Sequence, residues 1–306
     1  MRRHQAVRRY GLVLLFMAPW LIGFALFTFY PMAASLFYSF TRYNVLEPPV
    51  WVGLDNYRFM FHDPVFWQAM KNTVWIVGYG TAVSVVFGIL IASLVVTPRR
   101  GIRAYRTIYY LPTMVPPVAG ALAFLYLLNP ATGPVDQLLG FLHLPQPLWF
   151  YDPRFAKPGL LLLGLWGVGQ AMIIFMAALL DVPKELYEAA DLESANWLQK
   201  FRHITLPMIS PVIFFAVVTG VIYGFQYFTE AYVAARTTAP GHGLGEPQGS
   251  LLFYTVYLFG QAFTQFHMGY ASAMAWMLFL ITLVCVVAML KISRRWVYYG
   301  GGFFGR

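Results

Sequence analysis

The stretch ELYEAADLESANWLQKFRHITLP, residues 185–207, is the longest strongly polar segment of the chain. An apolar segment lies on each side of it, and it combines acidic, basic and small side chains with a tryptophan. Just before it, Asp181 is a suitable N-cap and Pro183 suits a first helical position, which predicts a helix that begins near Val182. Pro207 ends the segment where the next apolar run begins.

Small side chains are frequent in this polar segment and would let the backbone of another molecule approach closely. Acidic side chains beside them could pair with bases on that molecule. An apolar seam follows, supplied by Trp197, Phe201, Ile204 and Leu206. These features predict a helix–turn–helix that docks onto a protein partner, with a plain connecting linker as the alternative.

The composition of the chain indicates an integral membrane protein. Its 306 residues are 59% hydrophobic and only 11% charged, which is too apolar for a soluble domain of this length. The net charge of +9 does not predict nucleic-acid binding, because the bases cluster beside apolar runs, where they set membrane topology. The single cysteine, Cys285, excludes an intrachain disulfide, and no histidine pair has the spacing of metal ligands.

Six apolar runs are long enough to cross a bilayer, for which a helix needs about 20 residues. We expect spans at roughly 12–36, 73–97, 107–128, 159–180, 208–232 and 268–290. The first run exceeds the apolar core of a signal peptide, about 7–15 residues, so an uncleaved helix is expected there. Residues 251–267 mix aromatic and polar side chains, and we expect an interfacial or re-entrant helix rather than a seventh span.

The distribution of basic residues predicts the orientation of the chain. With six spans, both termini lie on one side together with the loops 98–106 and 181–207. That side carries 15 of the 21 Lys and Arg residues. The positive-inside rule therefore places both termini and the polar segment in the cytoplasm.

The sequence contains no signature of an enzyme. None of its lysines follows a glycine, as the phosphate-binding loop of an ATPase would require. No series of charged residues runs through the spans to carry protons or ions. Glu230 is the only carboxylate near membrane depth, and we expect it at the interface. No nucleophile, base and orienting group can be assembled, so neither a catalytic residue nor a metal ligand is predicted.

The polar segment resembles the coupling-loop motif of permeases in binding-protein-dependent ABC importers. That motif runs Glu-Ala-Ala, then Gly after three residues, then Ile-x-Leu-Pro. The matching positions here are Glu188, Ala189, Ala190, Ser194, Ile204, Leu206 and Pro207. The stretches VGLDNYRFMFHDPVFWQAMKNT, RTIYYLPTMVPPVAG, PLWFYDP, MGYASAMAW and SRRWVYY are similar to carbohydrate-type permeases, such as the larger membrane subunit of maltose transporters. The resemblance covers nearly the whole chain.

One position departs from the motif. The family places Gly in the turn between two short coupling helices, whereas this chain has Ser194 after Glu193. If that position has a positive φ, Ser costs on the order of 1 kcal/mol. Either the turn differs slightly or the two helices are more continuous here.

The resemblance implies an all-α, polytopic fold of the type I ABC importer (MetI-like) class with six transmembrane helices. It implies a single permease domain over residues 1–306, with a coupling loop at 181–207. The implied contacts with an ATPase are made by Glu188, Ala189, Ala190, Glu193, Ser194 and Ala195. The chain itself would need no cofactor, because ATP and Mg²⁺ would bind to the ATPase.

The resemblance also implies the partners and the location. They are a second homologous permease, two cytoplasmic ABC ATPase subunits and an extracytoplasmic solute-binding protein, in a bacterial or archaeal cytoplasmic membrane. The solute would be a sugar or oligosaccharide. Matching the maltose-type permease indicates solute contacts at Thr113, Gly167, Gln170, Gly220, Gly224 and Tyr227. The alternatives at these positions are helix packing for the glycines and an interfacial position for the tyrosine.

Three other functions are alternatives to sugar import. A glycerol-3-phosphate or polyol permease would have the same architecture. An ion-coupled secondary transporter would require buried carboxylates and internal repeats, neither of which is evident. A membrane scaffold that only recruits a partner would leave the Gly and Pro residues of LPTMVPPVAG without a purpose, because lipid-facing helices gain nothing from breaks.

Overall fold

The computed structural model describes residues 15–238, 243–294 and 297–298, and these are largely helical. Their contacts form two compact units. One unit contains the residues up to Asp63 and the segment Leu258–Leu278, and the other contains Pro64–Tyr257 and the residues from Phe279 onward. The long helix α15 (Met268–Ser293) contributes to both. The single permease domain expected from the sequence stays a prediction.

The first unit joins a long apolar helix to a small β-ribbon. The helical segment Leu15–Ser39 includes the π-helical turn η1 (Ala25–Phe29) and α2 (Tyr30–Ser39). It leads into the strands β1 (Thr41–Arg42) and β2 (Val50–Trp51), which pair antiparallel, and then into α3 (Asp55–His62). The side-chain amide of Asn56 donates to the carbonyls of Ser39 and Thr41 at 2.9 Å each, which holds α3 against the ribbon.

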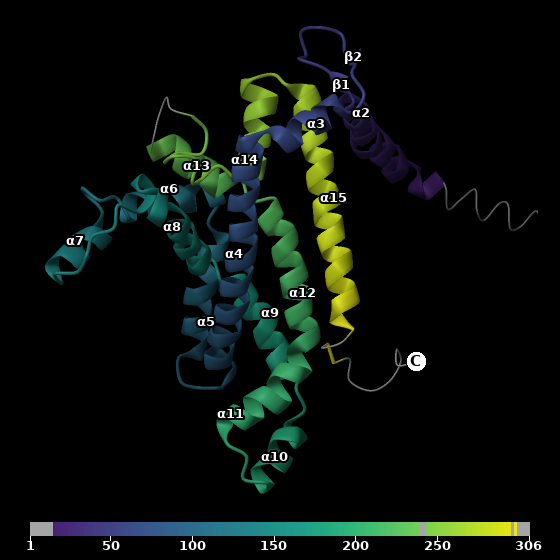
Figure 1. Ribbon diagram of the computed structural model, residues 1–306. Coiled ribbons are helices and arrows are strands. Elements are labelled where there is room, and N and C mark those ends of the chain that lie inside the picture. The colour runs from purple at the N-terminus through teal and green to yellow at the C-terminus, as the bar shows by residue number, and fades with distance from the viewer. Residues whose placement is uncertain (1–14, 239–242, 295–296, 299–306) are drawn as a thin grey trace, which may run out of the picture. The chain divides into compact units, whose positions relative to one another are not determined.

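Three helices pack side by side in the second unit: α4 (Pro64–Val96), α9 (Gly169–Leu180) and α12 (Leu206–Phe225) (Figure 1). They share a buried apolar cluster made of Ile89, Ala92, Val95, Met172, Phe175, Val182 and Ile209. A Cβ atom at Gly88 of α4 would lie only 2.9 Å from the Cβ of Ala171. The glycine therefore permits the close approach of α4 and α9.

Two of the expected spans are bent. Helix α5 (Ile102–Tyr110) continues into the 3₁₀ turn η2 (Leu111–Met114), and α6 (Pro117–Leu127) then departs at 103°. The pair Pro116 and Pro117 ends the first helix, because proline offers no backbone N–H. Helices α8 (Pro153–Trp166) and α9 meet at 50° across a break at Gly167 and Val168. The predicted spans at 107–128 and 159–180 are therefore each divided by a bend.

Four described helices are long and apolar enough to cross a membrane: Leu15–Ser39, Pro64–Val96, Trp197–Phe225 and Met268–Ser293. Counting each bent pair as one span gives six, the predicted number. The fifth predicted run, 208–232, is corrected at its end, because α12 stops at Phe225 and α13 (Thr229–Thr238) starts separately.

The remaining elements are short. They are α7 (Pro134–Phe141), η3 (Trp149–Tyr151), α10 (Lys184–Leu192), α11 (Trp197–Lys200), the π-helical turns η4 (Phe201–Thr205) and η5 (Gly260–Thr264), and α14 (Tyr254–Phe259). Residues 251–267 thus contain only α14 and η5, which agrees with the prediction that they form no seventh span. Whether they are re-entrant stays a prediction.

Candidate functional site

The polar segment forms two short helices that project from the second unit (Figure 1). Helix α10 begins at Lys184 with Pro183 in the N-cap position. The prediction that Asp181 is the N-cap is wrong: Asp181 has helical dihedrals, and its N–H donates to the carbonyl of Ala177 at the end of α9. An N-cap residue needs an extended conformation, which Pro183 has at ψ 130°.

A tight turn at Ser194 separates α10 from α11. Ser194 has a φ of 54°, and its N–H donates to the Asp191 carbonyl at 3.0 Å, while that of Ala195 reaches the Ala190 carbonyl at 2.9 Å. These bonds satisfy the last carbonyls of α10 in the way that a C-terminal glycine usually allows. The alternative of two continuous helices is therefore wrong, and Ser194 occupies the left-handed conformation that favours glycine.

A reciprocal cap begins the second helix. The Asn196 side chain accepts from the Gln199 N–H at 2.9 Å, and the Gln199 side chain accepts from the Asn196 N–H at 2.8 Å. The Lys200 ammonium pairs with the Asp191 carboxylate, and the Tyr187 hydroxyl lies 2.8 Å from the Thr205 hydroxyl. Both contacts join α10 to the helix that follows the turn, so the two helices form one connected projection.

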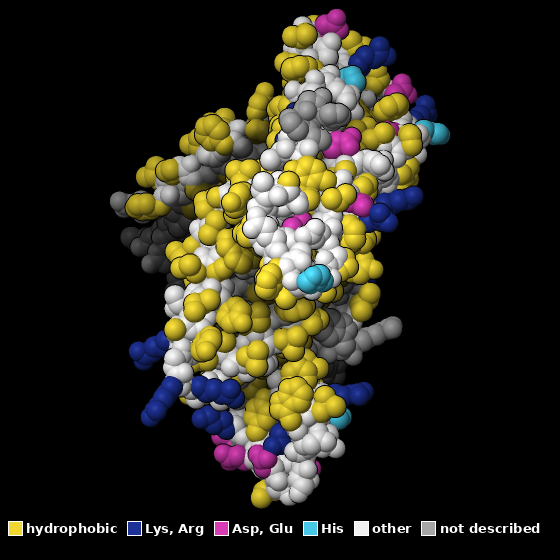
Figure 2. Space-filling model, turned by 90° about the vertical axis from the view of Figure 1, so that its left-hand side faces the viewer, with side chains coloured by type: hydrophobic (Ala, Val, Ile, Leu, Met, Phe, Trp, Pro, Cys, Tyr) yellow, Lys and Arg dark blue, Asp and Glu magenta, His cyan; other side chains and the backbone are white. Residues whose placement is uncertain are grey.

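The sequence-predicted docking residues lie together on this projection. Glu188, Ala189, Glu193 and Ser194 are exposed, whereas Ala190 and Ala195 are half-buried. Two large apolar side chains accompany them: Leu192 is 90% exposed and Trp197 is 72% exposed. In Figure 2, acidic and basic side chains gather at the end of the second unit where α10 and α11 lie.

The expected apolar seam is only partly formed. Phe201 and Ile204 pack against the buried cluster of the second unit, as does Tyr187. Trp197 stacks on Phe201 with ring centroids 5.5 Å apart, but most of its surface is exposed. Trp197 therefore belongs to the surface available for docking rather than to the seam. Its sequence position one turn before Phe201 could not distinguish these two roles.

A cavity of about 490 Å³ lies within the second unit. Its lining includes all six residues that the sequence indicated for solute contacts: Thr113, Gly167, Gln170, Gly220, Gly224 and Tyr227. They come from η2, from the break between α8 and α9, from the start of α9, and from α12 and the residues that follow it. Both helix breaks therefore contribute to the cavity wall. The solute-binding role of these residues stays a prediction.

The three glycines of this set differ in their surroundings. A Cβ atom at Gly220 would lie 2.8 Å from Thr81 Cγ2, and one at Gly224 would lie 3.0 Å from Val77 Cγ2. Both glycines thus also serve the packing of α12 against α4. A Cβ atom at Gly167 would meet nothing closer than the Gly164 carbonyl oxygen at 3.6 Å. Only Gly167 has room for a side chain.

The other cavity side chains offer hydrogen-bonding groups and aromatic surface. Thr113 donates its hydroxyl to the Tyr110 carbonyl at 2.7 Å, which leaves the oxygen free to accept another bond. Trp166 lines the cavity beside Phe124, with ring centroids 5.5 Å apart. The backbone of Tyr227 is held by the Thr255 hydroxyl, which donates to its carbonyl at 2.6 Å.

Glu230, which the sequence predicts at the membrane interface, lines this cavity. Its position relative to the membrane stays a prediction. It lies in the first turn of α13, three residues after Tyr227, and it is half-buried. Burial raises the pKa of the Glu230 carboxyl above its ordinary value. In the sequence, the three-residue separation from Tyr227 is the feature that could have indicated a place for Glu230 near the cavity.

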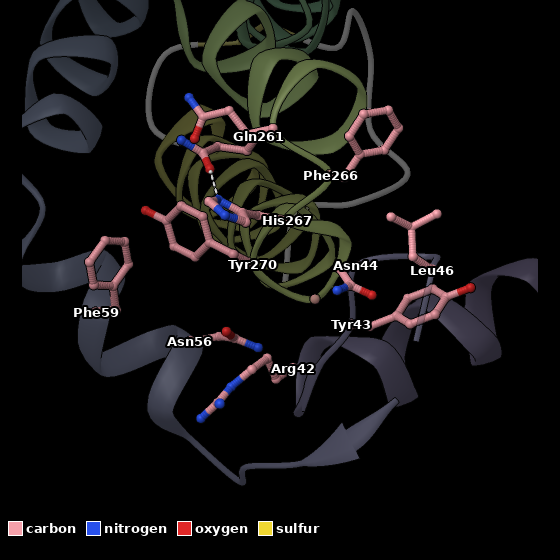
Figure 3. A pocket seen from close by; sticks show the side chains of 12 residues that line it. Arg42, Tyr43, Asn44, Leu46, Asn56, Phe59, Gln261, Phe266, His267 and Tyr270 are labelled. Atoms are coloured by element: carbon pink, nitrogen blue, oxygen red, sulfur yellow. Dashed lines mark hydrogen bonds between the residues drawn. The ribbon is translucent and has the colours of Figure 1, made fainter. Parts of the chain in front are cut away.

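A second cavity, of about 610 Å³, lies within the first unit (Figure 3). Several polar groups of its lining are already bonded: Asn56 holds the ribbon, and His267 Nδ1 lies 2.9 Å from Gln261 Oε1. The Gly269 N–H donates to the Tyr43 carbonyl at 3.1 Å, and a Cβ atom on Gly269 would overlap the Thr41 carbonyl oxygen. This region therefore joins the start of α15 to the loop after β1.

The described residues contain no group of His, Cys, Asp or Glu side chains that could hold a metal ion.

Comparison with known proteins assigns the chain to one protein family. A family model described as binding-protein-dependent transport system inner membrane component matches residues 84–298.

Among curated proteins, the chain is similar to the probable ABC transporter permease protein YesP of Bacillus subtilis (strain 168), with 38% identity over 98% of this chain and 96% of the relative. It is also similar to the arabinooligosaccharides transport system permease protein AraP of Halalkalibacterium halodurans, with 31% identity over 90% of this chain and 85% of the relative.

Among solved structures, the fold is similar to a chain of a bacterial alginate ABC transporter crystallised with an alginate pentasaccharide-bound periplasmic protein. The TM-score is 0.84, with 24% identity over 98% of this chain and 100% of the other.

Proposed function

Because the chain belongs to the family of binding-protein-dependent transport system inner membrane components, we propose that it is the membrane-spanning permease of an ABC importer that carries a sugar or oligosaccharide into the cytoplasm. Four apolar helices and two bent pairs provide the spans. The observation that carries the proposal is the meeting of Thr113, Gly167, Gln170, Gly220, Gly224 and Tyr227 on one cavity.

A sugar is the solute that best suits this cavity. Sugars bind to sites that combine aromatic faces with hydroxyl and amide groups, and Trp166, Thr113 and Gln170 supply these here. The relative named for arabinooligosaccharides supports the same class of solute. A cavity of about 490 Å³ on this chain has room for a sugar unit, and a second permease would supply the other wall.

The projection formed by α10 and α11 is the proposed contact with a cytoplasmic ABC ATPase. Glu188 would meet a base on the ATPase, and Ala189, Ala190, Ser194 and Ala195 would form the close contact. Its exposed acidic and apolar side chains support docking rather than a plain linker. ATP and Mg²⁺ would bind to the two ATPase subunits, and the permease itself would not be an enzyme.

The proposed orientation places both termini in the cytoplasm. The basic residues Arg99, Arg100 and Arg103 follow α4, Lys200 ends α11, and Arg202 lies in the turn η4 after it. Both regions would therefore face the cytoplasm under the positive-inside rule. Solute would arrive on the opposite side with an extracytoplasmic binding protein.

Purification of the tagged chain from its native host in mild detergent tests the proposal. Mass spectrometry of the co-purifying chains should identify an ABC ATPase and a second permease. Recovery of the chain alone, under conditions that preserve a known ABC importer from the same host, would contradict the proposal and favour a secondary transporter or a scaffold.

A further inference from the structure

The cavity proposed for the solute has an unbalanced set of charges. Its described lining contains one carboxylate, that of Glu230, and no lysine, arginine or histidine. Its other polar side chains are hydroxyl and amide groups, such as those of Thr81, Ser84 and Gln170. The described residues therefore give the cavity a negative charge and no positive one.

The backbone around Glu230 is held in place by hydrogen bonds. The Tyr232 N–H donates to the Phe228 carbonyl at 2.8 Å as α13 begins, and the Tyr227 carbonyl accepts from the Thr255 hydroxyl at 2.6 Å. None of the ion pairs between described residues involves Glu230. Its carboxylate therefore faces the cavity without a neutralising base from the part of the chain that the structure describes.

A carboxylate in this position acts differently on neutral and anionic solutes. Its two oxygens can accept hydrogen bonds from neighbouring sugar hydroxyls, and bonds to an ionised acceptor are stronger than neutral ones. A solute carboxylate or phosphate would instead be repelled, and salt screens the repulsion from a partly buried charge such as Glu230 less than that from an exposed one.

We propose that Glu230 is a specificity-determining residue that accepts hydrogen bonds from sugar hydroxyls and selects uncharged sugars over uronates and sugar phosphates. The inference rests on the proposed permease function and narrows its solute class. It disfavours the glycerol-3-phosphate alternative, because a phosphate in this cavity would face a carboxylate and no cation among the described lining residues.

The test uses the whole complex purified with its partner chains, without the binding protein. Affinities for galactotriose and trigalacturonate are compared at pH 7.5 by tryptophan fluorescence, since these probes differ at carbon 6, which is a hydroxymethyl group in one and a carboxylate in the other. Arabinotriose, xylotriose and glycerol-3-phosphate complete the panel. The native complex should bind a neutral probe about tenfold or more tightly than either anion.

Glu230→Gln should narrow this preference about tenfold, since it keeps the shape and removes the charge. Glu230→Asp should retain the preference. Glu47→Gln, a change of an exposed carboxylate outside the cavity lining, serves as the matched control and should also retain it.

Two results would overturn the inference alone: native complex that binds trigalacturonate or glycerol-3-phosphate as tightly as the neutral probes, or a preference that Glu230→Gln leaves unchanged. If no probe binds to a complex that still hydrolyses ATP, both the inference and the assignment of the cavity to the solute are overturned. Absence of the ATPase from the purified material would instead contradict the permease function.

Discussion

The Tyr187 hydroxyl lies 2.8 Å from the Thr205 hydroxyl, and this hydrogen bond joins α10 to the π-helical turn that continues into α12. Helix α12 carries Gly220 and Gly224 of the cavity lining. The contact therefore connects the projection proposed to meet the ATPase with a helix that lines the proposed solute cavity. A movement of α10 would be passed to α12 through this bond and through the packing of Tyr187 and Phe201.

Replacing Tyr187 with Phe should weaken this connection. The variant keeps the ring and loses one partly buried hydrogen bond, which should lower the free energy of unfolding by about 1 kcal/mol. We also expect fewer solute molecules imported per ATP hydrolysed, measured with the reconstituted complex. Tyr105→Phe, at a tyrosine of α5 that is 58% exposed, is the control. An unchanged transport-to-hydrolysis ratio in the Tyr187 variant would show that the bond has no part in coupling.

Replacing Ser194 with Gly should stabilise the turn between α10 and α11. The position has a φ of 54°, which glycine adopts without the steric cost that serine carries, so a gain of about 1 kcal/mol is expected. Thermal unfolding of the purified chain measures the change, and transport should be retained. Ser194→Val should destabilise the chain. A lower melting temperature for the glycine variant would contradict the left-handed turn.

The cavity glycines should respond differently to alanine. Gly220→Ala forces a methyl group against Thr81 of α4, and such overpacking typically costs about 1–3 kcal/mol. Gly167→Ala brings its methyl group no closer than ordinary van der Waals contact with the Gly164 carbonyl oxygen, at 3.6 Å, so folding should be nearly unaffected while solute affinity changes. Melting temperature and solute affinity are measured for both variants. Equal destabilisation by the two changes would show that Gly167 is a packing residue as well.

The amino-acid sequence alone was enough to predict the all-α fold class, the number of spans and the polar projection. Hydropathy could locate apolar runs at 107–128 and 159–180, but it carries no information on helix direction. The bend of 103° between η2 and α6 and that of 50° at Gly167 and Val168 depend on local backbone conformation. The prolines of LPTMVPP signalled a break there but not its angle.

The candidate sites were predicted to different extents. The resemblance indicated six positions that the structure brings to one cavity, because each lies at or near a helix break or on the face of α12 toward α4. The sequence did not predict Glu230 in the cavity lining, since that position depends on the end of α12 at Phe225 and the separate start of α13. Asp181 was misassigned because α9 continues up to it.

The stability of the chain should depend on pH through Glu230. Burial raises the pKa of its carboxyl in the folded state, so the folded chain holds the proton more tightly than the unfolded chain. The free energy of unfolding therefore falls as the pH rises from the ordinary carboxyl pKa through the higher pKa that Glu230 has in the folded chain. Glu230→Gln removes this loss and should raise the melting temperature at pH 7.5 but not below the ordinary carboxyl pKa. The same melting temperature for both chains at pH 7.5 would contradict the burial of a charge.

The projection of α10 and α11 is proposed to couple an ATPase to import through this chain. ATP-driven solute uptake and bound ATPase are measured together in proteoliposomes for the native complex and for the variants Glu188→Ala and Ala190→Trp. Glu188→Ala removes the proposed ion pair, and Ala190→Trp blocks the close approach, so both variants should lose most uptake and retain less ATPase, and the permease with the exposed Glu188→Ala change should keep its melting temperature. Unchanged uptake and unchanged ATPase recruitment in both variants would contradict the account.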